Sequence, residues 1–188
     1  MGTSVNQSSP RTLNWGAAQS GYRDANVPVQ RVAAEIWRAA VNQPKGNLAD
    51  LLAQPIVATL GGLVSQARSA AELARKSSFI IVEAKQASLA ADIARRAAMQ
   101  SVGASNPFKA YSEHLFSEAT SYLVARDLPG HVGTGRAKNV AESLDFAGQV
   151  ARYAASVAAH VELPKEVNAQ RWAAHVRTVV DSLRRTER

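Results

Sequence analysis

The chain has 188 residues, contains no cysteine and carries a formal net charge of +7 at pH 7. The length fits one domain, and the lack of cysteine excludes disulfides, thiolate metal sites and cysteine nucleophiles. No apolar run reaches the roughly 18 residues that a membrane-spanning helix needs, so we expect no membrane contact. The N-terminus lacks the apolar core of a signal peptide, which favours a cytoplasmic protein.

The excess of positive charge is spread along the whole chain, with no dense basic run. Arginine outnumbers lysine, and its planar guanidinium suits contacts with phosphate or carboxylate groups. A positive field of this kind favours an anionic partner, and nucleic acid is the first such partner to consider. No helix-turn-helix, zinc-finger or basic-zipper pattern accompanies it, so the charge alone does not establish that partner.

The N-terminal part of the chain divides into a polar arm and the start of a helical domain. Residues 1–12 are rich in Ser, Asn, Gln and Thr, and we predict that they form a disordered arm. Residues 13–188 are predicted to form one all-helical domain. Within it, residues 13–22 are consistent with a short helix in which Trp15 pins the arm onto the bundle.

Proline and glycine, the strongest local breaks in regular structure, separate the next segments. A helix is predicted over 28–43, with a proline in its first turn. A short helix over 47–54 follows a turn, and another helix is predicted over 55–76. Gly61 and Gly62 lie inside this last helix, where each costs about 1 kcal/mol relative to alanine. We interpret them as a close helix crossing or a bend.

A long stretch without proline runs from Ser77 to Ala104 and carries one clear helical period. We interpret it as the long central helix around which the other helices pack. Whether residues 55–102 form one kinked helix or two packed helices stays open. The stripe of the central helix consists of residues three and four apart in the sequence, which are Phe79, Val82, Gln86, Leu89, Ile93 and Ala97.

The second half of the chain predicts three further helices. An asparagine followed by a proline is a start signal for an aromatic-rich helix over 107–127. A glycine-rich loop over 128–138 leads to a long helix over 136–162, and the last helix is predicted over 164–188. The pattern as a whole predicts an all-α, single-domain bundle of six or seven helices. The helix over 136–162 carries a stripe of mostly small residues that allows close packing, namely Val140, Leu144, Ala147, Ala151, Ala154 and Ala158.

The glycine-rich loop is the strongest candidate site. Its glycines let backbone N–H groups turn toward a ligand, and cationic side chains lie where the next helix begins, an arrangement that suits an anion. It lacks the Lys-Ser/Thr pair and the preceding strand of a nucleotide-hydrolase phosphate loop, and a plain connection between helices is the alternative. We predict anion or nucleic-acid contact by Gly133, Thr134, Gly135, Arg136 and Lys138, together with the helical residues Arg95, Arg96 and Arg177.

The histidines do not form a convincing catalytic or metal site in the sequence. His114 and Glu118 are four residues apart and could face one ion, but two ligands do not make a site. His160 and His175, with a serine such as Ser156, could form a hydrolase triad, but no nucleophile-elbow motif supports one. We therefore expect no catalytic residue, no metal and no cofactor.

Three functions remain open. The first is a non-enzymatic helical interaction protein, such as an adaptor, an immunity-type protein or a subunit of a complex, that binds a protein partner through a helix face. The second is a basic accessory protein that binds nucleic acid. The third, which the residues support least, is an enzyme with a site in the bundle core. Clustering of the predicted cations on one surface favours nucleic acid, and scattering favours a protein partner.

Overall fold

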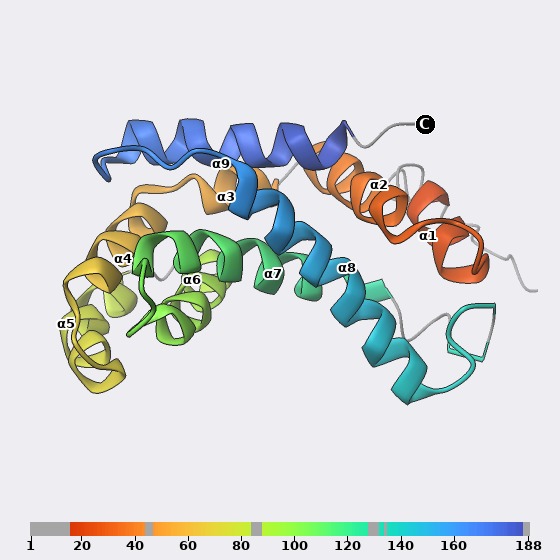
Figure 1. Ribbon diagram of the computed structural model, residues 1–188, viewed down its shortest axis with the longest axis horizontal. Helices are drawn as coiled ribbons and strands as arrows, with labels where there is room; N and C mark the ends of the chain where they lie inside the picture. Colours follow the sequence, from red (N-terminus) through yellow and green to blue (C-terminus); the bar gives the residue numbers. More distant parts are fainter. Residues whose placement is uncertain (1–15, 44–46, 84–87, 128–131, 134, 186–188) are drawn as a thin grey trace, which may run out of the picture.

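The described part of the chain folds into nine α-helices, with no strand among them (Figure 1). None of these helices is long and apolar enough to cross a membrane. The predicted arm, residues 1–12, lies outside the described residues. The computed structural model describes residues 16–43, 47–83, 88–127, 132–133 and 135–185. The helices are α1 (Gly16–Arg23), α2 (Val29–Val41), α3 (Leu48–Leu52), α4 (Pro55–Gln66), α5 (Ala70–Glu83), α6 (Ser88–Ser101), α7 (Pro107–Asp127), α8 (Val140–His160) and α9 (Ala169–Arg184).

Three helices occupy the described part of residues 55–104, so the prediction of six or seven helices in the bundle was too low. The break between α4 and α5 has a local cause. The Ser69 hydroxyl accepts a hydrogen bond from the backbone N–H of Glu72 (3.2 Å), and the Glu72 carboxylate accepts one from the backbone N–H of Arg68 (2.9 Å). The two bonds form a variant of the capping box, in which the Glu72 carboxylate bonds the residue before the cap, and they start a new helix at Ala70.

The prediction of a single central helix over Ser77–Ala104 was wrong. α5 ends at Glu83, and α6 is a separate helix that begins at Ser88. In α6 the predicted inward positions Ile93 and Ala97 are buried. The apolar period misled the prediction because two packed helices satisfy a periodic stripe as well as one helix does. The remaining stripe positions before α6 have side chains outside the described part of the structure, and these are Phe79, Val82 and Gln86.

α7 is the central helix of the bundle, and it packs against α2, α4, α6 and α8. Its bounds are those predicted from the asparagine–proline start signal. A helix that is apolar on more than one side can be surrounded by neighbours, and α7 meets this condition. Its buried apolar residues include Tyr111, Leu115, Phe116, Ala119, Leu123 and Val124.

Buried polar groups tie α7 and α9 to α3 and α4. The Tyr111 hydroxyl donates a hydrogen bond to the Val57 carbonyl (2.8 Å), and the Trp172 indole N–H donates one to the Leu52 carbonyl (2.8 Å). Gly61 faces the Tyr111 ring, and a Cβ atom at this position would lie 2.8 Å from a ring carbon. Glycine therefore allows the close crossing of α4 and α7, which is one of the two interpretations offered above.

Both α8 and α9 begin later than predicted, because asparagine side chains cap them. The side chains of Asn139 and Asn168 each accept a hydrogen bond of 2.9 Å from the backbone N–H three residues later. This is the usual geometry of a helix N-cap. The helices consequently start at Val140 and Ala169, and the residues predicted to form their first turns belong to the connecting segments.

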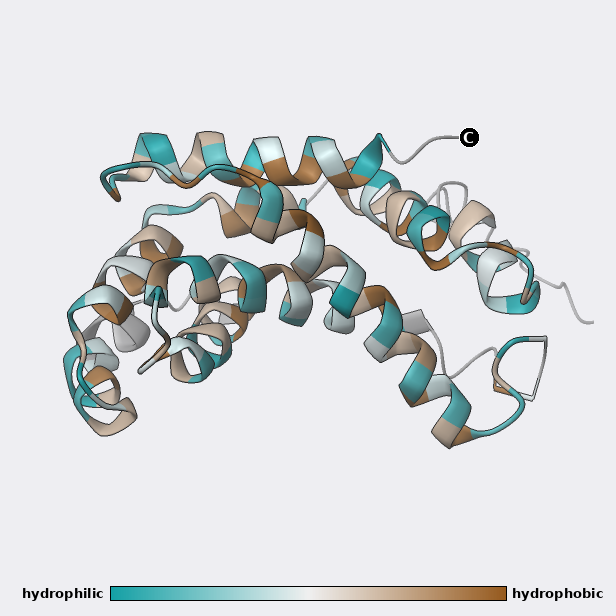
Figure 2. Cartoon of the chain, in the orientation of Figure 1, coloured by the Kyte–Doolittle hydropathy of each residue, from teal (hydrophilic) through white to brown (hydrophobic). Residues whose placement is uncertain are grey.

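The arrangement of α8 and α9 decides which surfaces are open to a partner. α9 lies along one edge of the molecule, and the start of α8 extends away from the other helices at the lower right of Figure 1. Hydrophobic residues of α9 face the bundle, whereas hydrophilic residues face outward (Figure 2). α8 crosses α7 and also packs against α2 and α9, so these helices cover one face of it.

Candidate interaction surfaces

The described part of the glycine-rich loop makes a tight turn against the end of α1. Gly133 and Gly135 have positive φ angles of 91° and 52°, and the Gly133 N–H donates to the Ala137 carbonyl (2.6 Å). A Cβ atom at position 135 would lie 1.6 Å from the Arg23 carbonyl oxygen, so only glycine fits there. Thr134, also predicted to contact an anion, lies outside the described residues.

Arg136 anchors this loop to the segment that follows α1. Its Nη2 donates hydrogen bonds to the carbonyl oxygens of Asp24 (2.9 Å), Ala25 (3.1 Å) and Val27. Its guanidinium carbon lies 4.6 Å from the centre of the Phe146 ring, within range of a cation–π interaction. Partial burial lowers the pKa of Arg136, but an arginine remains charged. An external anion would have to compete with these internal acceptors for the same guanidinium.

A carboxylate of the protein already occupies the N-terminus of α8. Glu142 accepts a hydrogen bond from the Lys138 backbone N–H (3.0 Å) and one from the Asn139 side chain (3.2 Å). Negative charge is favourable at a helix N-terminus, and Glu142 supplies it from within the chain. The Lys138 side chain is exposed. Anion contact at this loop stays a prediction, and Lys138 is the predicted cation there that is most open to solvent.

The three predicted arginines on helices lie on two other elements. Arg95 and Arg96 are on α6, and both pair with Asp92, at 3.4 Å and 2.8 Å. Arg96 also bridges α6 to α7 through Glu118 (2.9 Å). Arg177 is exposed on α9. The structure thus places the described predicted residues on three elements, which are α6, the loop before α8, and α9.

A buried serine–histidine pair joins α7 to α9, and the sequence-based search missed it. Ser112 Oγ lies 2.8 Å from His175 Nε2, and His175 Nδ1 lies 3.2 Å from the Glu162 carbonyl oxygen. A carbonyl oxygen can only accept, so Nδ1 carries the proton and the neutral ring accepts from the serine hydroxyl at Nε2. Burial lowers the pKa of His175, which favours this neutral form.

The serine–histidine pair is closed to solvent. Ser112 is 1% exposed and His175 is 4% exposed. His175 contributes to the floor of an open groove beside the segment between α8 and α9, but Ser112 does not line that groove. A substrate therefore has no route to the serine oxygen in this structure. The pair acts as a hydrogen-bonded contact between two helices, and the Trp172 ring packs against the histidine at 5.4 Å.

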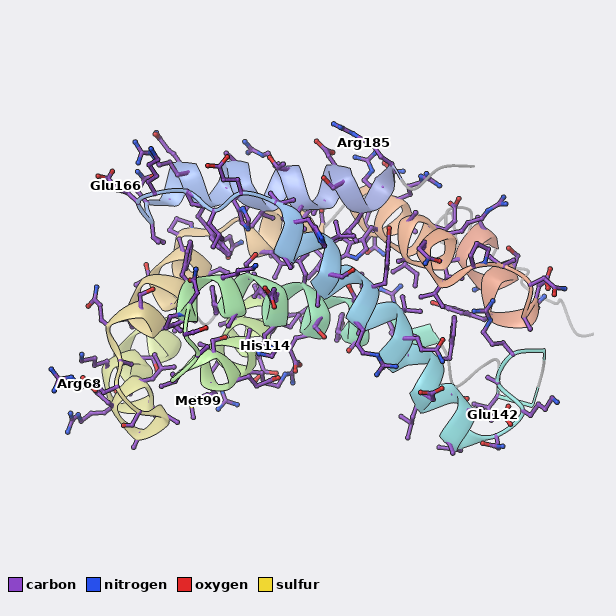
Figure 3. All side chains as sticks on the ribbon, in the orientation of Figure 1. Arg68, Met99, His114, Glu142, Glu166 and Arg185 are labelled. Carbon is purple, nitrogen blue, oxygen red and sulfur yellow. The ribbon has the colours of Figure 1, made fainter. Side chains whose placement is uncertain are left out.

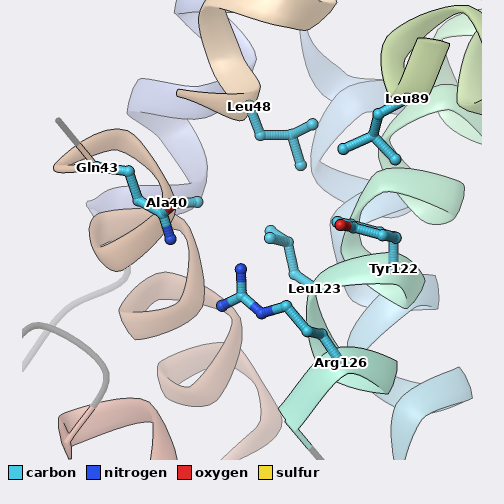
Figure 4. Close-up of a pocket in the computed structure, with 7 residues that line it drawn as sticks. All are labelled: Ala40, Gln43, Leu48, Leu89, Tyr122, Leu123 and Arg126. Carbon is cyan, nitrogen blue, oxygen red and sulfur yellow. The ribbon is translucent and has the colours of Figure 1, made fainter. Parts of the chain in front are cut away.

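One of the other pockets is small, and the polar clusters among the described residues are incomplete as metal sites. A pocket of about 80 Å³ lies between α2, α3, α6 and α7 (Figure 4). Ligand pockets usually measure about 300–1,000 Å³, so this one is too small for a typical cofactor. No group of three or more metal-ligating side chains that could hold an ion occurs among the described residues. The pocket is lined by Ala40, Gln43, Leu48, Leu89, Tyr122, Leu123 and Arg126.

The start of α8 exposes two large aliphatic side chains. Val140 is 65% exposed and Leu144 is 69% exposed, more than any other large hydrophobic residue that the structure describes. Further along the predicted small-residue stripe, Ala151, Ala154 and Ala158 are buried. The stripe thus extends to the start of α8, beyond the part of the helix that the bundle covers. In Figure 3, Glu142 marks this end of α8, on the opposite side of the molecule from Arg68.

Comparison of this chain with protein families, with curated proteins and with solved structures found no match.

Proposed function

We propose that the protein is a non-enzymatic interaction protein that binds a protein partner through the start of α8. The exposure of Val140 and Leu144 carries this proposal, because the same stripe is buried where the bundle covers it. An exposed apolar feature of this kind is a usual mark of a protein–protein contact.

The spacing of the two side chains suits a helix that docks in a groove of the partner. Residues i and i+4 lie on the same face of a helix, and such pairs serve as anchors in helix-in-groove recognition. Burying one valine or leucine side chain contributes about 1.5–3 kcal/mol. Loss of Leu144 from such a contact should therefore weaken binding by roughly tenfold or more, since about 1.4 kcal/mol corresponds to a factor of ten.

The experiment places a photo-crosslinking amino acid at position 144 and, as a control, at position 149. Gln149 is also exposed on α8, but it lies on another side of the helix. We expect irradiation in cells to give a discrete protein adduct from position 144 and none from position 149. The absence of an adduct at 144, or the same adduct from both positions, would contradict the proposal.

The crosslinked partner is then produced and titrated against two matched variants. Leu144→Ser should weaken binding by about tenfold or more, whereas Gln149→Ser should stay within about twofold. Both side chains are exposed, so the midpoint of thermal unfolding should change little in either variant. Equal affinities of the two variants would show that the partner uses another surface, and the proposal would then be wrong.

A further inference from the structure

The exposed face of α9 is the most basic helix surface in the described part of the chain. α9 and its cap residue hold four arginines and one acidic residue, Asp181. α7 and α8, in contrast, each hold more acidic than basic residues when histidine is counted as neutral. Although positive charge is spread along the sequence, the net positive charge of a single helix is therefore greatest on α9. The arginines lie at solvent-facing or partly exposed positions, Arg171, Arg177, Arg184 and Arg185.

These arginines are open to an external anion. Arg177 and Arg185 are exposed and have no ion-pair partner among the described residues. Arg171 pairs with Glu166 (2.9 Å), and both side chains are largely in solvent. The distance from Arg184 Nη1 to its acidic partner is a longer 3.5 Å. Exposed pairs of this kind contribute at most about 1 kcal/mol, so a phosphate group can displace the acid.

We infer that the outer face of α9 binds the phosphate backbone of double-stranded nucleic acid. At 1.5 Å per residue, the exposed face from Arg171 to Arg185 spans about 21 Å along the helix. Phosphates repeat about every 3.4 Å along each strand of a DNA duplex, so a face of this length can lie along roughly six of them. The arginine guanidinium forms paired hydrogen bonds with phosphate oxygens, which makes it better suited than lysine to this contact.

The composition of the face selects the duplex over other anionic partners. The one aromatic residue of α9, Trp172, is buried, so the face offers no ring on which an unpaired base could stack. No large hydrophobic side chain is exposed on α9, whereas a helix that lies on a membrane buries an apolar face in the lipid. The surface is separate from Val140 and Leu144, so this inference goes beyond the proposed protein contact and is tested independently of it.

The experiment measures fluorescence anisotropy of a labelled duplex of about 20 base pairs, titrated with the full chain over a series of salt concentrations. The α9 variant combines Arg171→Gln, Arg177→Gln and Arg185→Gln. The control variant combines Arg68→Gln, Arg75→Gln and Arg152→Gln. These control residues are also exposed arginines, and they lie before α5, on α5 and on α8. Both variants lose the same net charge, so they differ only in where the charge is removed.

The wild-type chain should show a log–log salt slope of about −3 to −4, because each neutralised phosphate contributes about −0.9. The α9 variant should lose about 2–3 units of that slope and bind at least tenfold more weakly at low salt, and the control variant should change less than about threefold. Equal losses in the two variants would overturn the inference, because net charge alone would then explain binding. Tighter binding to single strands, to polyglutamate or to anionic vesicles, or no binding to the duplex at low salt, would also overturn it.

Discussion

Two aromatic clusters of the bundle are built on different elements, and different interactions stabilise each of them. Neutral, buried hydrogen bonds anchor the Trp172 cluster to other elements, whereas a cationic loop residue packs on the Tyr22 cluster. The Trp172 cluster consists of Phe108, Tyr111, Trp172 and His175. The Tyr22 cluster consists of Tyr22, Phe146 and Arg136.

The difference shows how this chain builds a core with few aromatic residues. In the Trp172 cluster, a phenol, an indole and an imidazole each bond to a group on another element, so packing and hydrogen bonding hold the same helices together. Burial also raises the pKa of Tyr111 well above its usual value, which keeps that phenol neutral. In the Tyr22 cluster, one guanidinium holds a loop onto the end of α1. Substitutions in the two clusters should consequently differ in how much they lower the free energy of unfolding and in how many helices they affect.

Substitution of Arg136 should have the largest effect. Arg136→Ala removes the hydrogen bonds to the segment after α1 and the contact with Phe146, and we expect it to lower the free energy of unfolding by about 2–3 kcal/mol. Arg136→Lys keeps the charge but loses the planar fork, so it should recover less than half of the loss. Urea denaturation measures both values.

Hydrogen exchange separates a local effect of Arg136 from a global one. If this residue clamps one side of the bundle, Arg136→Ala should increase exchange in α1 more than in α9, where Trp172 is held by other bonds. Equal increases in the two helices, or a change in unfolding free energy below about 0.5 kcal/mol, would mean that Arg136 does not close the Tyr22 cluster as a separate unit.

The second prediction compares neighbouring glycines on α4. Gly61→Ala places a Cβ atom against the Tyr111 and Phe108 rings, so we expect a net destabilisation of about 1–2 kcal/mol from overpacking. Gly62 has no atom within 4 Å of the position of its Cβ. Gly62→Ala should stabilise the protein by about 0.5–1 kcal/mol, because alanine is the better helix former. Opposite signs in thermal unfolding would confirm the close crossing of α4 and α7, and two stabilising substitutions would contradict it.

Sequence reasoning succeeded where local chemistry marks a boundary. The bounds of α7 followed from Asn106 and Pro107, and the Asn106 side chain accepts the expected capping bond from the Lys109 N–H (3.0 Å). The start of α5 was missed although its signal, Ser69 followed by Glu72, is equally local. There the apolar period continued across the break and concealed the cap, because periodicity reports which residues face inward and not where a helix ends.

The partners of polar side chains were beyond local inference. Arg136 was chosen for its place in a glycine-rich loop, but its acceptors lie more than a hundred residues earlier in the chain. Ser112 meets His175 across 63 residues, and no nearby pattern marks that pairing. Leu144 is a third case: its stripe was identified, but its exposure depends on where the surrounding bundle stops covering α8. Each of these outcomes is a property of tertiary packing.

The smallest expected effect is the pH dependence of the Trp172 cluster, which comes from its histidine, His175. Burial lowers the pKa of His175 in the folded state, so the unfolded chain binds this proton more readily. The contribution of neutral His175 to the free energy of unfolding should be fully present above the pKa of an unfolded histidine, about 6.5. It should decrease as the pH drops below that value. The charged groups that line the groove with this histidine are Glu162, Lys165 and Arg171.

The measurement is the free energy of unfolding at pH 7 and pH 5 for the wild-type chain and two variants. His175→Gln removes the titrating group but keeps a donor and an acceptor, so it should lose less stability between the two pH values than the wild type does. His160→Gln replaces an exposed histidine at the end of α8 and should lose as much as the wild type. If His175→Gln and the wild type lose the same stability between the two pH values, then the acid effect comes from groups elsewhere in the bundle. Protonation of His175 would then not destabilise the Trp172 cluster, and the prediction would be wrong.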